Sequence, residues 1–276
     1  MKIRKVVSAL PRHFFLSFLM FVAISPLIIL IFNSLKSRAN LGADPVGYPD
    51  KLIFGNYANA VEQSNFLNSM TNSLMLATFT VIPVLVLGGL AAYSLSRIQP
   101  RGTGAVMAYM LGVSTLPLWL YIVPLFYYWK TLGLINSFFG LIILYTAFNS
   151  PFAIFLLRSF LLKVPKEVEE AAVIDGANRM QILIRVILPL TWTGFLTVGL
   201  LVAVAVWGEF QVALIFISDP EKFPVTTAFF AFQQQFGNDW TLTSAVAVLT
   251  ILPVLALFLS FQRKFTEGLT QGSVKA

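Results

Sequence analysis

The chain offers few side chains that could act as an acid, a base or a nucleophile. Cysteine is absent, histidine occurs once, and 12 Asp and Glu are spread over 276 residues. These counts exclude a disulfide framework, a thiolate metal site and a cysteine nucleophile. Glu209 stands apart, because it is the one acid in or near an apolar run. A carboxylate in such a run is costly and is a functional candidate, either in a pathway or as the structural partner of a neighbouring helix.

A second group of carboxylates lies in a polar segment between two apolar runs, about residues 161–189. The first half of this segment predicts a short helix over Lys166–Asp175, with Pro165 at its first position. Three acids fall in or just after its first turn, where they complement the positive end of the helix dipole: Glu167, Glu169 and Glu170. Gly176 is placed to end the helix in a left-handed conformation, and a second helix, about Arg179–Leu188, is expected to follow.

Small side chains form a stripe along the first of these two helices. Val168, Ala171, Ala172 and Asp175 recur at the i, i+3, i+4 and i+7 spacing of one helix face. Because alanine side chains are small, they let another surface approach closely. The stripe therefore predicts either a docking helix or an ordinary amphipathic helix at a membrane interface.

The composition indicates that helices in lipid must position these residues. Hydrophobic residues make up 57% of the chain, charged residues 11%, and the mean hydropathy is +0.80, whereas a soluble domain carries roughly 25% charged residues. We therefore expect an all-α polytopic membrane protein forming a single transmembrane domain over residues 1–276. Six apolar runs are long enough to span the hydrocarbon core: about 14–32, 70–95, 105–129, 138–160, 190–218 and 242–261. The third contains Pro117 and Pro124, and Gly208-Glu209 interrupts the fifth.

The net charge of +7 is a topology signal when it is divided among the loops. With the N-terminus in the cytoplasm, 14 of the 19 Lys and Arg fall on the cytoplasmic side of six spans. Basic residues mark cytoplasmic loops, so both termini are predicted to be cytoplasmic. The same bias explains the positive net charge without a nucleic-acid partner. The first run follows Lys2, Arg4 and Lys5 as in a signal peptide, but its length favours a retained span.

The spacing of residues in the 161–189 segment resembles a known signature. Glu170-Ala171-Ala172, then Gly176 and, after nine intervening residues, Val186-Ile187-Leu188-Pro189 resemble the Glu-Ala-Ala loop of bacterial ABC importer permeases, with Val186 where Ile is usual. From Asn72 on, nearly the whole chain resembles maltose-type carbohydrate permeases, above all their shorter, G-like subunit. Trp207-Gly208-Glu209-Phe210 is one such stretch, although Asn is commoner at the position of Gly208.

The resemblance implies a type I importer permease fold with six transmembrane helices in the bacterial inner membrane. It implies four kinds of partner: a second homologous permease, two cytoplasmic ABC ATPases, an extracytoplasmic solute-binding protein and the lipid bilayer. This chain has no phosphate-binding loop of its own. We therefore expect a transport subunit that is not an enzyme and binds no cofactor, with ATP and Mg²⁺ on the partner ATPase.

The resemblance also implies roles for four sets of residues. The set that couples the chain to the ATPase is Glu170, Ala171, Ala172, Asp175 and Gly176. The C-terminal tail is expected either to contact the ATPases or to be a frayed end, with Gln271, Gly272 and Ser273 as its candidates. Candidates for the translocation pathway are Trp207, Glu209 and Asn149. In the long polar loop of about residues 219–241, the candidates for contact with the binding protein are Gln234, Asn238 and Trp240.

The expected substrate is a sugar, an oligosaccharide or a polyol. Three alternatives remain at this point: a permease for glycerol phosphate esters, an ion-coupled secondary transporter and an intramembrane enzyme. An ion-coupled transporter usually carries ionisable groups at membrane depth, and this chain offers Glu209 alone. An intramembrane enzyme needs His, Cys or clustered acids there, which the apolar runs lack.

Overall fold

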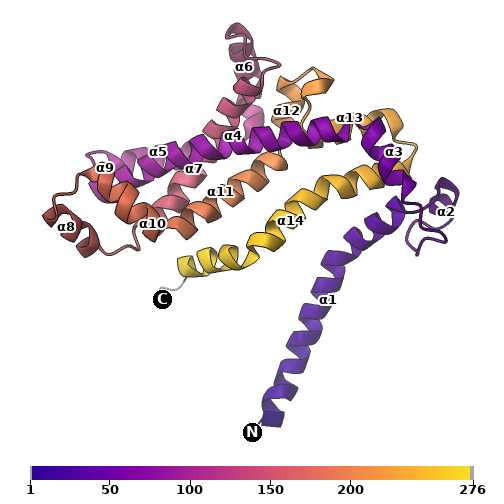
Figure 1. The fold of residues 1–276 in the computed structure, drawn as a ribbon, viewed down its shortest axis with the longest axis horizontal. Coiled ribbons are helices and arrows are strands. Elements are labelled where there is room, and N and C mark those ends of the chain that lie inside the picture. The colour runs from indigo at the N-terminus through magenta and orange to yellow at the C-terminus, as the bar shows by residue number, and fades with distance from the viewer. Residues whose placement is uncertain (1, 274–276) are drawn as a thin grey trace. The chain divides into compact units, whose positions relative to one another are not determined.

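The computed structural model describes the backbone of residues 2–273 and the side chains of residues 13–262, and over this range every regular element is helical. The longest helices are α1 (Lys2–Ser34), α4 (Phe66–Tyr93), α7 (Phe138–Leu161), α11 (Trp192–Trp207) and α14 (Trp240–Ser273). Shorter α-helices are α2 (Arg38–Ala43), α3 (Gly55–Gln63), α5 (Thr103–Ser114), α6 (Leu118–Thr131), α8 (Lys166–Ile174), α9 (Arg179–Ile182), α10 (Leu188–Leu190), α12 (Gln211–Phe216) and α13 (Val225–Phe236). Two π-helices, η1 (Ser94–Ile98) and η2 (Leu183–Ile187), and one 3₁₀-helix, η3 (Pro220–Lys222), complete the set (Figure 1).

Four of the described helical segments are long and apolar enough to cross a membrane: His13–Ser34, Phe66–Ile98, Phe138–Leu161 and Trp240–Gln262. Two further pairs of helices qualify if each bent pair is one span. The all-helical prediction is therefore confirmed, with four to six candidate spans. The exposed phenylalanine and leucine side chains along α1 are those expected of a helix whose surroundings are apolar.

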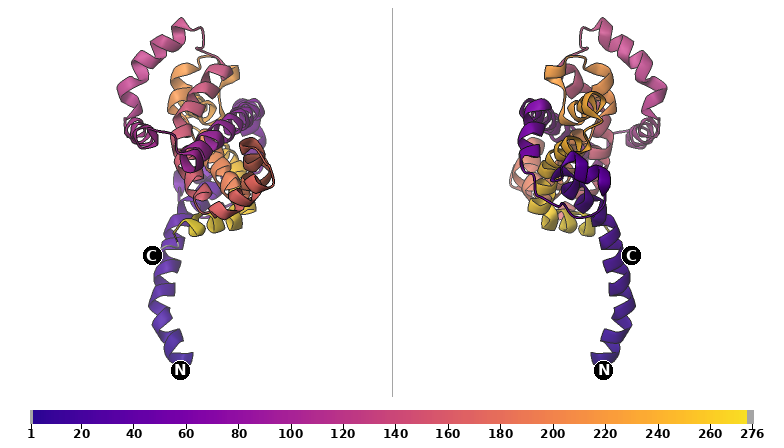
Figure 2. Two further views of the ribbon diagram at one scale, coloured as in Figure 1. Left: turned by 90° about the vertical axis from the view of Figure 1, so that its left-hand side faces the viewer. Right: turned by 90° about the vertical axis from the view of Figure 1, so that its right-hand side faces the viewer.

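The first bent pair differs from the continuous run predicted over 105–129. Helices α5 and α6 meet at 94°, and Figure 2 shows the bend plainly. Pro117 is the N-cap of α6 with extended backbone angles, φ −61° and ψ 134°. Proline lacks an N–H and disfavours the helical conformation at the residue before it, so α5 does not continue through Leu116 into α6. Pro124 lies inside α6 and does not end it.

The second bent pair lies where the fifth run was expected to begin. The segment Arg179–Leu190 meets α11 at 78°, with Thr191 at the break. The Thr191 hydroxyl donates to the carbonyl of Ile187 at 2.7 Å, a bond that competes with the helix ladder. At the other end α11 stops at Trp207, and Gly208-Glu209 separates it from α12 as the sequence indicated.

The described chain divides into two compact units. One unit comprises Met1–Leu67 and Ala228–Pro253, and the other comprises Asn68–Thr227 and Val254–Ala276. In the second unit α7 packs along α11, with Leu144, Leu157 and Val198 almost fully buried. The first unit contains α2 and α3, which lie in the segment between α1 and α4.

Candidate functional site

The 161–189 segment folds into short, firmly ended helices. Helix α8 begins after Pro165, which is its N-cap rather than its first helical residue. It ends at Ile174, and Gly176, two residues on, has a φ of +80° that confirms the predicted left-handed turn. The amides of Gly176 and Ala177 donate to the carbonyls of Val173 and Ala172, at 3.0 and 2.9 Å, which is a Schellman motif. Helix α9 begins at Arg179, as predicted, and its cap was not predicted: Asn178 and Gln181 form a reciprocal capping box.

The predicted coupling residues differ in their exposure. Glu170, Ala171, Asp175 and Gly176 are exposed, whereas Ala172 is half-buried and packs against the core of its own unit. Glu170 takes part in no ion pair or hydrogen bond among the described side chains. Val173 and Ile174 were not predicted as site residues, yet Ile174 is 87% exposed. Helix α8 therefore presents a free carboxylate and two apolar side chains on its surface.

The neighbouring carboxylate, Glu169, faces inward. Its Oε1 lies 2.8 Å from Nε of Arg97, a residue of η1. Arg97 also donates from Nη2 to the carbonyls of Leu161 and Val164, at 2.5 and 2.6 Å. The sequence gives no direct signal for this pairing, because 72 positions separate the two residues.

Glu209 caps helix α12. Its Oε1 accepts from the amide of Val212 at 2.7 Å, and its Oε2 accepts from the amide of Ala213 at 3.1 Å. The same Oε2 accepts from the hydroxyl of Tyr145 on α7 at 2.6 Å. The Thr226 hydroxyl donates to the main-chain carbonyl of Glu209 at 2.7 Å. Three donors therefore satisfy the carboxylate of Glu209, in keeping with structural pairing as one of its two predicted roles. The other role, in the pathway, stays a prediction.

The other two pathway candidates lie near this cap. Asn149 donates from Nδ2 to the carbonyl of Tyr145 at 2.8 Å, so Tyr145 contacts both Asn149 and Glu209. Trp207 is the last residue of α11 and is buried. The structure thus brings Glu209 and Asn149 onto one buried tyrosine of α7.

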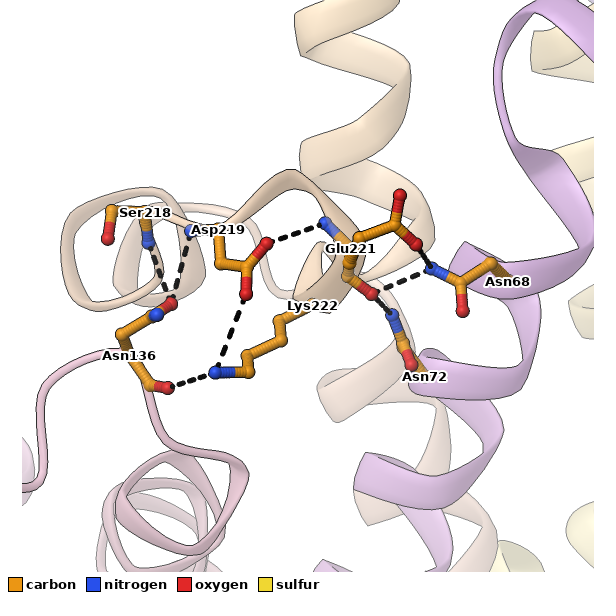
Figure 3. Close-up of polar contacts among 7 residues, drawn as sticks. All are labelled: Asn68, Asn72, Asn136, Ser218, Asp219, Glu221 and Lys222. Carbon is orange, nitrogen blue, oxygen red and sulfur yellow. Dashed lines mark hydrogen bonds and ion pairs between the residues drawn. The ribbon is translucent and has the colours of Figure 1, made fainter.

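A polar network fixes the segment that follows α12, as Figure 3 shows. Asn136 adopts φ +58°, accepts at Oδ1 from the amide of Asp219 at 3.1 Å, and accepts at its carbonyl from Lys222 Nζ at 3.1 Å. From the other side, Asn68 and Asn72 of α4 donate to the carbonyl of Glu221, at 2.7 and 2.8 Å. The segment is therefore held between the start of α4 and the turn before α7.

In the other unit, two candidates for contact with the binding protein line a cavity of about 430 Å³. Its walls comprise Asn33, Arg38, Leu41, Gly42, Pro45, Asn238, Trp240, Thr241 and Ser244. The third candidate, Gln234, is exposed near the end of α13. The segment was expected to be a loop, but α13 covers half of it.

An ion pair between Arg38 and Asp239 lies beside this cavity. Arg38 Nε donates to Asp239 Oδ2 at 2.7 Å, and the Thr241 hydroxyl donates to Oδ1 at 2.6 Å. Burial by itself raises the pKa of Asp239, but the hydrogen bonds from Thr241, Arg38 and the Leu242 amide outweigh it and the pKa is lowered. The pair therefore stabilises the fold at neutral pH, and that contribution is lost as the pH falls below the ordinary Asp value.

Helix α14 continues to Ser273, so the backbone of the predicted tail residues Gln271, Gly272 and Ser273 is helical. Their side chains lie outside the described residues. Among the described side chains, no three His, Asp or Glu residues lie close enough together to hold a metal ion.

Residues 84–271 match the family described as "Binding-protein-dependent transport system inner membrane component". The chain is 34% identical to the sulfoquinovosyl glycerol transport system permease protein SmoH of Agrobacterium fabrum, over 94% of this chain and 91% of that protein. It is 33% identical to the diacetylchitobiose uptake system permease protein NgcG of Streptomyces coelicolor, over 92% of this chain and 85% of that one. A crystal structure of a bacterial ABC transporter involved in the import of alginate contains a chain of similar fold, with a TM-score of 0.80, 26% identity and coverage of 96% and 97%.

Proposed function

The chain belongs to the family of binding-protein-dependent transport system inner membrane components, and we propose that it is the permease subunit of an ATP-driven importer of sugars or oligosaccharides. It is a multi-pass protein of the inner membrane and a transport subunit, not an enzyme. The names of the relatives given above refer to the transport of sulfoquinovosyl glycerol, diacetylchitobiose and alginate. These substrates share a carbohydrate unit, which supports the carbohydrate class for this chain.

The observation that carries this proposal is the surface of α8. Glu170 is exposed and unpaired among the described residues, and Val173 and Ile174 lie exposed after it. A carboxylate beside apolar side chains suits a partner with a basic side chain and an apolar groove. Because the chain has no phosphate-binding loop, another subunit must hold ATP and Mg²⁺, and we assign the exposed face of α8 to that ATPase.

The assembly we propose has five protein subunits of four kinds. This chain pairs with a second homologous permease, two ATPases bind on the cytoplasmic side, and a solute-binding protein delivers substrate from outside. Both termini lie in the cytoplasm, as the distribution of Lys and Arg favours. The C-terminal end of α14 then points toward the ATPases, with Gln271–Ser273 as its contact residues.

The remaining site residues follow from this orientation. Gln234, Asn238 and Trp240 lie on the extracytoplasmic side and contact the binding protein. The cap formed by Glu209, with Trp207 and Asn149 close by, adjoins the translocation pathway. Both assignments are supported by the exposure or the mutual contacts of these residues.

The proposal is tested by transport in proteoliposomes. The chain is co-expressed with the second permease and the ATPase, reconstituted, and assayed with the solute-binding protein against a panel of labelled mono- and oligosaccharides, polyols and glycerol phosphate esters. We expect uptake of a carbohydrate that requires both ATP and the binding protein. Uptake driven by an ion gradient without ATP would contradict the proposal, and uptake of a glycerol phosphate ester alone would overturn the substrate class.

A further inference from the structure

We propose that the ion pair between Arg97 and Glu169 is the internal joint that holds α8 to the ends of α4 and α7, which makes Arg97 a positioning residue for energy coupling. The inference rests on the proposed function, because that function makes α8 the helix that meets the ATPase. It concerns the inward face of α8, whereas the docking residues lie on the outward face.

Arg97 is placed by an unusual helix end. Helix α4 passes into the π-helix η1, and Gln99 ends it with φ +47° while its amide donates to the carbonyl of Ser94 at 2.9 Å. Single π turns within helical segments are rare and are found frequently at functional sites. The widened turn carries Arg97 into the protein, where its side chain is only 5% exposed.

The guanidinium of Arg97 contacts two segments, the C-terminal end of α7 and helix α8. Its Nη2 donates to the carbonyls of Leu161 and Val164, at the C-terminal end of α7. Leu161 is the last residue of α7, and its carbonyl also accepts from the amide of Val164, which lies beyond the helix. A cation at this end of α7 complements the helix dipole. Its Nε faces Glu169 on α8 at 2.8 Å. One side chain of η1 therefore contacts both α7 and α8.

Each side of the ion pair depends on the other. Arg97 Nε and Glu169 Oε1 are both buried atoms, and among the described residues the polar contact of each is the 2.8 Å ion pair with the other. A buried charge is tolerated when it is paired. Removing Arg97 takes the cationic partner from Glu169, and removing Glu169 leaves Arg97 with its two carbonyl acceptors alone. The pair thus fixes the orientation of α8, and it does so more strongly than an ion pair at the surface would.

The two adjacent carboxylates of α8, those of Glu169 and Glu170, face different surroundings. Successive residues of an α-helix differ by about 100° in direction, so Glu169 faces Arg97 while Glu170 is exposed. Ala172 also packs inward. A force applied to the exposed face of α8 is consequently transmitted to the ends of α4 and α7 through the Arg97 guanidinium.

A second arginine provides a matched comparison. Arg158 of α7 donates from Nε to the carbonyl of Leu95 in η1 at 3.2 Å. This bond ties α7 to η1 in the reverse direction, and among the described residues Arg158 makes no hydrogen bond or ion pair with α8. Losing Arg158 therefore weakens the connection between α4 and α7 and leaves the Arg97–Glu169 joint in place.

The joint is tested in the assembled transporter. Glu169→Gln and Arg97→Gln are compared with wild type, with Arg97→Lys, and with Glu167→Gln, which makes the same change at an exposed position of α8. We expect the two Gln variants to lower the substrate imported per ATP hydrolysed by roughly 2- to 30-fold, the range for residues that modulate coupling between sites. Glu167→Gln should match wild type. Arg97→Lys should lie between, because an ammonium cannot reproduce the planar fork of the guanidinium.

A distance measurement tests the joint without transport. The chain has no cysteine, so spin labels at Val173→Cys on α8 and Ser159→Cys on α7, both exposed, report on these two helices alone. We expect Glu169→Gln to broaden the distance distribution and Glu167→Gln and Arg158→Gln to leave it narrow. An unchanged distribution and an unchanged ratio of import to hydrolysis in Glu169→Gln would overturn the joint. A wild-type complex that lacks ATP-driven uptake would instead contradict the proposed function, while the label distances would still decide the joint.

Discussion

At the scale of the residue, Glu209 illustrates how a carboxylate is kept among apolar helices. Its two oxygens accept from the amides of Val212 and Ala213 and from the hydroxyl of Tyr145. The amides are in the first turn of α12, whose N–H groups have no partner within the helix. The charge is therefore compensated locally, and the cap fixes the direction in which the chain leaves the end of α11.

This arrangement predicts a difference between two substitutions of Glu209. Glu209→Ala removes both side-chain acceptor oxygens, and each buried donor left unsatisfied costs about 1–3 kcal/mol, so we expect a clear fall in the melting temperature of the purified complex. Glu209→Gln keeps one acceptor oxygen and should retain most of the stability and most of the uptake. The measurements are thermal unfolding and the initial uptake rate.

Tyr145→Phe is the control, because it removes only the tyrosine donor and should have a small effect. If Glu209→Gln abolished uptake while the melting temperature stayed at the wild-type value, the negative charge itself would be required and the capping account of Glu209 would be wrong.

At the scale of the helix, the contact between α7 and α11 depends on small residues. In lipid the hydrophobic effect does not drive helices together, so their packing depends on the close approach of backbones, which glycine allows. A Cβ added at Gly194 of α11 would lie 2.6 Å from Cγ of Phe160 on α7. No such constraint exists at Gly112 in α5, where a Cβ would meet nothing within 4 Å.

We therefore expect Gly194→Ala to destabilise the protein by about 1–3 kcal/mol, the usual cost of overpacking a well-packed contact. Gly112→Ala, also in a helix, should be neutral or slightly stabilising because alanine favours helix more than glycine does. Thermal unfolding of the two variants in the same detergent distinguishes them. Equal melting temperatures would show that the α7–α11 contact yields to an added methyl group.

At the scale of the whole molecule, the sequence predicted what depends on composition and local spacing. Low charge and apolar runs indicated a helical membrane protein, and Gly176 indicated the end of α8. The sharp bend at Thr191 was not predictable, because threonine occurs in many straight helices and its bond to Ile187 depends on the observed backbone. The pairing of Arg97 with Glu169 was hidden for another reason: it joins positions far apart in the chain, and only the folded ends of α4 and α7 bring them together.

We propose that α8 couples this permease to an ATPase through Glu170. The Glu170→Ala variant of the reconstituted importer tests this coupling directly. ATP hydrolysis and uptake are measured on the same proteoliposomes, with Glu167→Ala as the control for charge on α8. Removing one member of a hydrogen-bonded charge pair at an interface costs about 2–5 kcal/mol. We predict that Glu170→Ala folds and inserts normally but loses uptake that is coupled to hydrolysis. Uptake per ATP equal to wild type in this variant would contradict the account.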